Sequence, residues 1–257
     1  GVMREIELLT QNNYREIVLT GIHLGSYRGD TVPTDITTLV KEIDRRDYPC
    51  RFRISSLDPN EVTDELIEIM SSSKSICNHL HLAVQSCDDD ILKNMNRHHY
   101  TKKVIVEKIK KVYESIKDVS IGVDILTGFP GETDPQFLNT YKTLQELPLT
   151  YFHIFPFSKR KGTPAYDFKC QIDFRVKEER CGLLKSLGEN KRQEFYNTQV
   201  GKYADVLIES VSDGIGEGKS RNYIPVVFKY KGEIRNREVN VLLKEIKGKE
   251  VFGIYGI

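Results

Sequence analysis

Residues 119–133 read Val-Ser-Ile-Gly-Val-Asp-Ile-Leu-Thr-Gly-Phe-Pro-Gly-Glu-Thr, an apolar run followed by a turn rich in glycine. The β-branched residues of the run predict a buried strand over 119–127. The turn is Gly128-Phe129-Pro130-Gly131-Glu132-Thr133, whose glycines let a backbone pass close to a bound molecule. Its last two residues begin a helix, where backbone N–H groups are free. A tight, capped turn without a ligand is the simpler interpretation of this segment alone.

The same alternation of strand and helix extends in both directions from this segment. Strands are predicted by apolar runs at 16–22, 51–57, 79–85 and 150–157. Amphipathic helices are predicted to begin near Thr34-Asp35, Thr63-Asp64, Thr101 and Asp134. Repeated strand–helix units imply parallel strands with right-handed crossovers. A barrel or part-barrel is therefore favoured, with function at the C-terminal ends of its strands.

The two ends of the chain depart from this pattern. Residues 3–12 have helical periodicity but no strand precedes them, so we expect a strand of the sheet to lie ahead of Gly1. Residues 173–198 predict a charged helix. Short strands follow at 203–209, 223–230, 237–246 and 250–255, with a flexible turn at 213–218, and can form a small antiparallel barrel. We therefore predict a part-barrel (1–168), a helical connector (169–198) and a small β-barrel (199–257).

Charge and composition restrict the partners of the protein. The net charge is only +1, but residues 97–111 and 159–202 each carry an excess of five positive charges. Such local excess predicts contact with a polyanion, although solvated helix faces would have the same composition. The sequence has neither a run of roughly 20 apolar residues, as a membrane span requires, nor a signal-peptide pattern. We expect a cytoplasmic protein.

The cysteines and histidines predict no metal site. The five cysteines are separated by 27, 10, 83 and 11 residues and form no CxxC or CxxxCxxC cluster. His81 and His153 lie in predicted strands, where lining the barrel is a simpler role than binding an ion. No catalytic triad or carboxylate pair is evident, so the sequence identifies no catalytic residue.

Polar residues end three further predicted strands: Thr20-Gly21, Ser55-Ser56 and Gln85-Ser86. Arg97 follows the last of these and can bind a carboxylate or phosphate in a bidentate manner. Because the C-terminal ends of parallel strands meet at one edge of a sheet, these weak signals reinforce one another and the turn at 128–133.

In this order the motifs resemble those of the radical-SAM methylthiotransferases, the MiaB-like family. The family pattern includes Leu-Gln-Ser-Gly, then Leu-Lys-x-Met-x-Arg-x-Tyr, Asp-x-Ile-x-Gly-Phe-Pro-Gly-Glu-Thr, and Phe-x-x-Ser-x-Arg-x-Gly-Thr-x-Ala. The chain has corresponding residues at 84–87, 92–100, 124–133 and 155–165. One departure is Cys87, where the family usually has glycine. The C-terminal strands resemble the TRAM domain of the same family.

The resemblance implies a partial (β/α)6 TIM-like radical-SAM barrel, here lacking its first strand, followed by a small antiparallel TRAM-like β-barrel. It implies S-adenosylmethionine and two [4Fe–4S] clusters as cofactors. The cluster cysteines would precede Gly1, so this chain by itself is expected to hold neither cluster and to be inactive. The cofactor pocket is implied to be lined by Thr20, Gly21, Ser55, Ser56, Gln85, Ser86, Arg97, Gly128, Phe129, Pro130, Gly131 and Glu132.

The implied partner is tRNA, with an RNA-binding surface at Lys159, Arg160, Lys161, Lys219 and Arg221. The implied reaction inserts a methylthio group at C2 of N6-threonylcarbamoyladenosine, with a sulfur donor that the sequence does not identify. Isopentenyladenosine in tRNA and a ribosomal-protein side chain are the next alternatives. Two other classes stay open: a cluster-free RNA-binding module, and a (β/α) lyase or hydrolase, which would need a convergent acid–base pair.

Overall fold

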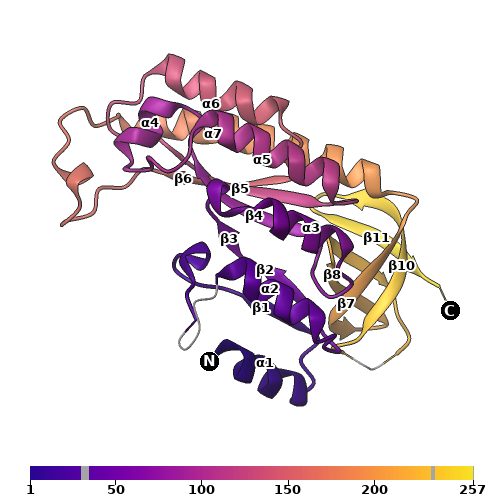
Figure 1. Ribbon diagram of the computed structural model, residues 1–257. Coiled ribbons are helices and arrows are strands. Elements are labelled where there is room, and N and C mark those ends of the chain that lie inside the picture. Colours follow the sequence, from indigo (N-terminus) through magenta and orange to yellow (C-terminus); the bar gives the residue numbers. More distant parts are fainter. Residues whose placement is uncertain (30–34, 233–234, 257) are drawn as a thin grey trace.

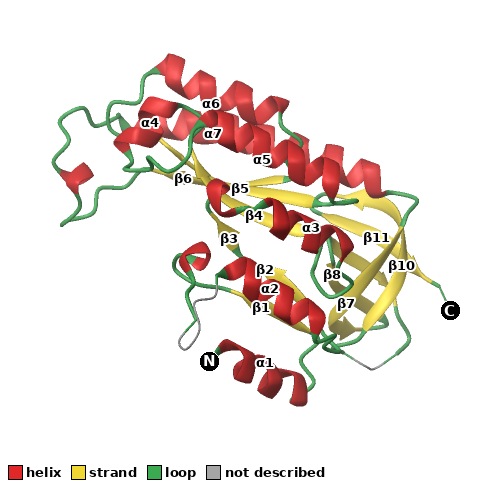
Figure 2. Ribbon diagram, viewed as in Figure 1, coloured by secondary structure: helices red, strands yellow, loops and turns green. Residues whose placement is uncertain are grey.

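The computed structural model describes residues 1–29, 35–232 and 235–256, arranged in two parts (Figures 1 and 2). The first part contains parallel strands covered by helices, and the second is a closed β-barrel. Helix α7 (Phe174–Gln199) runs along the first part and leads into the second. None of the helices in the described part of the chain combines the length and apolarity needed to cross a bilayer.

The first part has the predicted parallel strands, which are β1 (Glu16–Leu19), β2 (Arg51–Ile54), β3 (Ser56–Leu57), β4 (His79–Gln85), β5 (Ser120–Thr127) and β6 (Tyr151–Pro156). β1 pairs with β2, and β3 to β6 form a sheet in chain order, every pair being parallel. Their C-terminal ends therefore lie at one edge, which confirms the α/β part-barrel. The strand predicted at 51–57 is interrupted at Ser55, which separates β2 from β3.

Helices connect these strands where the sequence predicts them: α1 (Val2–Gln11), α2 (Ile36–Arg45), α3 (Asp64–Ser72), α5 (Lys102–Ser115) and α6 (Asp134–Glu146). Thr63 accepts a hydrogen bond from the amide of Leu66, and Thr101 from that of Val104, so both predicted caps are confirmed. Thr34 lies outside the described residues, and Asp35 caps α2 by accepting from the Thr38 amide. A short helix that the sequence analysis did not predict, α4 (Asp89–Asn94), follows β4.

The two faces of the sheet differ in chemistry because side chains alternate along a strand. Leu80, Leu82 and Val123 are fully buried and belong to the apolar core shared with helix residues such as Ile105 and Ile109. The other face, here called the inner face, carries the alternate side chains His79, His81, Asp124, Tyr151 and His153. One face therefore stabilises the fold, and the other is polar.

The closed barrel contains β7 (Tyr203–Ser212), β8 (Ile215–Ser220), β9 (Pro225–Lys229), β10 (Glu238–Lys247) and β11 (Glu250–Tyr255). Its strands pair antiparallel except for β9 and β11, which are parallel. The predicted flexible turn at 213–218 is wrong: only Asp213-Gly214 turns, and β8 begins at Ile215. Gly216 and Gly218 both belong to β8. Close packing requires glycine at these positions, because a Cβ at Gly216 would meet Phe228 and one at Gly218 would collide with the Leu207 carbonyl.

The barrel packs against the N-terminal ends of the parallel strands (Figure 1). Arg51 donates to the Lys219 carbonyl at 2.9 Å, and Arg53 donates to the Arg221 carbonyl at 3.0 Å. Both arginines are almost fully buried, and both form ion pairs with Glu16, at 2.6 and 2.9 Å. The barrel therefore lies at the opposite end of the part-barrel from the C-terminal strand edge.

Candidate functional site

The C-terminal strand edge begins at the ends of β1 and β3. Thr20 and Gly21 follow β1 and are exposed. The Ser55 amide donates to the Leu19 carbonyl at 3.0 Å, so the end of β1 and the junction between β2 and β3 lie side by side. The Ser56 hydroxyl is buried and has no hydrogen-bond partner among the described residues. An unpaired buried hydroxyl of this kind is energetically costly.

Gln85 ends β4 in an unusual backbone conformation. Its φ is 63°, in the left-handed region that non-glycine residues rarely adopt. The pairing of β4 with β5 shifts register between Leu82 and Gln85, so the strand bends at this point. Strained backbone of this kind is concentrated at functional sites. Gln85 is half-buried and lies four positions along β4 beyond His81, the residue that pairs with Ser56.

Ser86 and Cys87 turn away from this edge and pack against α6. The hydroxyls of Ser86 and Thr140 lie 3.1 Å apart, and the Cys87 amide donates to the Thr140 hydroxyl at 3.0 Å. Both residues are buried, and burial raises the pKa of the Cys87 thiol to about 12. The hydroxyl of Ser86, which the sequence analysis expected in the cofactor pocket, thus holds β4 against a helix.

The turn at 128–133 has the glycine conformations that its sequence indicated. Gly128 and Gly131 have φ of 73° and 84°. The buried Glu132 carboxylate accepts from the Gly128 amide at 2.7 Å and pairs with Arg180 of α7 at 2.6 Å. Burial raises the pKa of Glu132, although its pairing with the Gly128 amide and Arg180 opposes this shift. Glu132 therefore fixes the shape of the turn.

Pro130 and Phe129 complete this turn. Both are buried, and Phe129 stacks edge-on against Phe157 and Phe168, with ring centroids 5.2 and 6.0 Å apart. The Gly131 amide donates to the Cys170 carbonyl at 2.7 Å. The turn is thus attached to the segment at 157–170, which carries the predicted RNA-binding residues.

Arg97 lies in a separate group on the loops that follow β3 and α4. Its guanidinium donates to Asp58 at 2.7 Å and to the Tyr100 hydroxyl at 2.9 Å, and His99 shares the Asp58 carboxylate at 2.8 Å. His23 pairs with Glu61 beside them. Arg97 was expected near the charged end of a ligand, whereas its charge is balanced here by Asp58.

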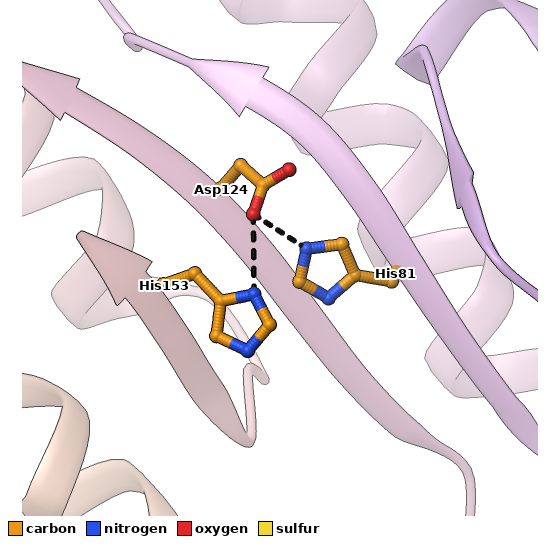
Figure 3. Close-up of side chains that lie close together, drawn as sticks. All are labelled: His81, Asp124 and His153. Carbon is orange, nitrogen blue, oxygen red and sulfur yellow. Dashed lines mark hydrogen bonds and ion pairs between the residues drawn. The ribbon is translucent and has the colours of Figure 1, made fainter. Parts of the chain in front are cut away.

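The inner face carries a hydrogen-bonded group that includes His81 and His153, the two histidines predicted to line the barrel (Figure 3). Nε2 of His81 lies 2.8 Å from Oδ1 of Asp124, and Nδ1 of His153 lies 3.3 Å from the same oxygen. The Tyr151 hydroxyl lies 2.9 Å from Nδ1 of His81 and 2.8 Å from Nε2 of His79. The alternate polar residues His79 and His81 of β4, and Tyr151 and His153 of β6, are the sequence signal that could have indicated this group.

Charge in this group is concentrated on Asp124. Burial raises the pKa of this carboxyl, but hydrogen bonds from His153 and His81 outweigh burial and hold it well below its ordinary value. The pKa of His79 is lowered well below its ordinary value, mainly by burial and also by the positive charge of Arg53. His79 is therefore neutral beside an ionised Asp124.

The predicted RNA-binding residues lie at opposite ends of the molecule. Lys159, Arg160 and Lys161 follow β6 on an exposed segment beyond the C-terminal strand edge. Arg221 instead lies between the two parts, where it donates to the Lys74 carbonyl at 2.6 Å and to Glu238 at 2.8 Å. Lys219 lies over the Tyr223 ring at 5.0 Å. These five residues therefore do not form one continuous surface.

The described cysteines do not fit an iron–sulfur cluster. Cys50, Cys77, Cys87 and Cys181 are buried and Cys170 is exposed. Among the described residues, the side-chain groups close enough to share an ion are His81–Asp124–His153 and His23–Asp58–Glu61, neither of which includes a thiol. A cluster requires three or four thiolates close together.

Comparisons with known proteins agree with the resemblance to radical-SAM methylthiotransferases. The family model described as the radical SAM superfamily matches residues 2–144. Threonylcarbamoyladenosine tRNA methylthiotransferase MtaB of Bacillus subtilis is 35% identical over 89% of this chain and 52% of its own length. The tRNA-2-methylthio-N(6)-dimethylallyladenosine synthase of Acetivibrio thermocellus is 33% identical over 96% of this chain and 52% of its own length. The chain thus spans about half the length of these curated relatives.

A solved structure supports the fold. The radical S-adenosylmethionine methyltransferase TsrM of Kitasatospora setae aligns with 84% of this chain and 35% of its own chain, at a TM-score of 0.51 and 15% sequence identity. At this identity the likeness concerns the arrangement of strands and helices.

Proposed function

The chain belongs to the radical SAM superfamily, and we propose that it forms part of a tRNA methylthiotransferase that modifies C2 of N6-threonylcarbamoyladenosine. The observation that carries this proposal is that the family motifs follow successive parallel strands, at their C-terminal ends and in the same order along the chain. Relatives that match about 90% of the chain are named for this reaction.

S-adenosylmethionine is proposed to bind at this edge. The unpaired hydroxyl of Ser56, the strained Gln85 and the exposed Gly131, where the backbone can approach a ligand closely, support this placement. When bound, this cofactor supplies the radical chemistry of the superfamily. The role of the chain is to bind and orient it, with Glu132 and Arg180 holding the turn rigid. Because the described cysteines do not fit an iron–sulfur cluster, no step is assigned to them.

The substrate is proposed to be tRNA in the cytoplasm, approached from the strand edge. Lys159, Arg160 and Lys161 provide positive charge beside the edge, and Phe155 is half exposed at the end of β6. Phosphate contacts position a nucleic acid, while exposed aromatic rings stack on unpaired bases. This arrangement suits an RNA loop whose modified base enters the strand edge.

Dimethylallyladenosine in tRNA is the second candidate substrate, because relatives named for its methylthiolation also match most of the chain. The relative from Desulfitobacterium hafniense, a tRNA-2-methylthio-N(6)-dimethylallyladenosine synthase, is 31% identical over 98% of this chain. This value is close to the 35% of the threonylcarbamoyladenosine enzyme, so overall identity alone does not choose between the two nucleosides.

Mass spectrometry of nucleosides tests the proposal. The gene that encodes this chain is deleted, and total tRNA is digested to nucleosides. We expect the methylthio form of threonylcarbamoyladenosine to disappear while its unmodified precursor accumulates. Loss of the methylthio group from dimethylallyladenosine instead would establish the second substrate. If both methylthio nucleosides persist at their original levels, the proposed function is wrong.

A further inference from the structure

The inner face brings two imidazoles to one carboxylate from three neighbouring strands. His81 comes from β4, Asp124 from β5 and His153 from β6, and their side chains point toward one another (Figure 3). One potential ligand atom from each residue lies within 4.8 Å of the other two. The strands are hydrogen-bonded in one sheet, so the three side chains are held on a rigid element.

The spacing of these atoms suits a shared ion. Atoms bound at about 2.1 Å from one transition-metal ion lie roughly 3.0 Å apart in an octahedral site and roughly 3.4 Å apart in a tetrahedral one. The distances from Oδ1 of Asp124 to His81 Nε2 and His153 Nδ1 are 2.8 and 3.3 Å. Two histidines and one carboxylate form a donor set that binds Zn²⁺ and Fe²⁺ in other proteins.

Hydrogen bonding outside the three ligands also fits. A histidine that binds a metal usually uses its second ring nitrogen in a hydrogen bond that fixes the ring. Nδ1 of His81 lies 2.9 Å from the Tyr151 hydroxyl. The His153 side chain is 55% exposed and that of Asp124 is 20% exposed, so an ion can enter and keep an open coordination position.

The second group of histidine and carboxylates is a poorer candidate. Asp58 already accepts hydrogen bonds from Arg97 and contacts His99, and Glu61 accepts from the Asp58 amide at 2.8 Å. A guanidinium beside the carboxylate also opposes the binding of a cation. At Asp124, by contrast, the contacts found within the described part of the chain all involve Oδ1.

We propose that His81, Asp124 and His153 form a binding site for one divalent transition-metal ion, with Tyr151 orienting His81. The site lies on the inner face and contains no cysteine. Metal binding at this site requires neither S-adenosylmethionine nor RNA. If the site binds no metal, the proposed function is unaffected.

Titration of the untagged, chelator-treated chain tests this site. Zn²⁺ binding is measured by calorimetry, and Co²⁺ binding by visible absorption. We expect one ion per chain, with affinity reduced more than about ten-fold by His153→Ala and by Asp124→Asn, and about ten-fold by Tyr151→Phe. The exposed histidine variant His98→Ala is the matched control and should leave the affinity unchanged. Circular dichroism checks that each variant is folded.

Three results would overturn the proposal. The first is absence of stoichiometric binding by the folded chain at micromolar free Zn²⁺. The second is binding that His153→Ala and Asp124→Asn do not weaken, or that His23→Ala weakens instead. The third is a thiolate charge-transfer band in the Co²⁺ spectrum, which would assign the ion to a cysteine.

Discussion

Individual buried charges determine how the strand edge is held. Glu132 and Arg180 form a buried ion pair, with side chains 2% and 5% exposed. Such a pair adds little net stability compared with an apolar pair, but removing one partner leaves an uncompensated charge. The ion pair instead holds the Glu132 carboxylate in place, and the same carboxylate accepts the hydrogen bond from the Gly128 amide that shapes the turn.

Replacing Arg180 is therefore expected to be severe. Arg180→Met leaves Glu132 buried without its cation and should lower the free energy of unfolding by about 3–5 kcal/mol. The control is Lys41→Met, which breaks an exposed ion pair with Glu65 and should cost less than about 1 kcal/mol. Urea denaturation measures both. Equal effects of the two substitutions would show that the buried pair does not hold the turn.

His79 should make stability depend on pH. Its pKa is lowered in the folded protein, so the folded chain binds this proton less readily than the unfolded chain does. The free energy of unfolding is therefore unaffected by His79 above the unfolded pKa of about 6.5. It decreases as pH falls below that value, by up to about 1.4 kcal/mol per pH unit, because the unfolded chain takes up the proton first. His79→Gln should reduce this slope between about pH 6.5 and 5, measured by urea denaturation. An unchanged slope, equal to that of the exposed control His98→Gln, would contradict the assignment.

At the scale of elements, α7 packs on β6 through a glycine. A Cβ at Gly188 would lie 3.2 Å from the Phe152 ring, whereas a Cβ at Gly182 of the same helix would meet nothing within 4 Å. The helix therefore has one glycine required by close packing and another that packing does not require.

Alanine at these two positions should have different effects. Gly182→Ala should raise the free energy of unfolding by about 0.5–1 kcal/mol, because alanine favours the helix. Gly188→Ala has the same helical advantage but must displace Phe152, so it should be less stable than Gly182→Ala. Thermal or urea unfolding measures both variants. Equal stabilisation by the two would show that α7 can move away from β6 without cost.

Elements were more predictable from the sequence than contacts were. The strands and helices of the part-barrel follow from apolar periodicity, since a covered parallel sheet leaves a strong pattern. β8 was missed because its glycines indicate a turn in a local window, although they are required by the neighbouring Leu207 and Phe228. The packing of Ser86 against Thr140, 54 residues away, depends on tertiary structure and has no local signal.

At the scale of the whole molecule, the two parts are joined through buried charge. Glu16 pairs with Arg51 and Arg53, which in turn donate to backbone carbonyls of the closed barrel. Hydrogen bonds and charge from the two arginines outweigh burial and lower the pKa of Glu16. Nothing in the local sequence pattern indicates that these strand residues bind a second domain, and the boundaries at 168 and 198 stay a prediction.

Removing the charge of Glu16 should loosen this junction. Glu16→Gln leaves the buried Arg53 guanidinium without its carboxylate, while Arg51 keeps only its ion pair with Glu238, and should cost about 3 kcal/mol or more. We expect faster limited proteolysis near α7 and separate unfolding transitions for the two parts. Glu5→Gln, at an exposed position of α1, is the control. Cooperative unfolding of the Glu16 variant in one unchanged transition would contradict this account of the junction.

The basic segment beyond the strand edge should dominate contact with tRNA. Charge reversal at Lys159, Arg160 and Lys161 is expected to weaken tRNA affinity and to flatten its dependence on salt, because fewer counterions are released. Reversal at Lys219 serves as the comparison, since this residue lies at the opposite end of the part-barrel. Filter binding at several salt concentrations measures the slopes. Equal slopes for the original chain and the triple variant would exclude this segment as the RNA contact.

The most direct test of the central claim is complementation of the gene deletion, read by the methylthio content of tRNA. The intact gene and the control variant His98→Ala should restore methylthio-threonylcarbamoyladenosine. Gln85→Ala, and Gly128→Val in the strained turn, should leave the unmodified precursor while the protein stays folded and abundant. Full restoration by both strand-edge variants would contradict the claim that this edge binds the cofactor of a tRNA methylthiotransferase.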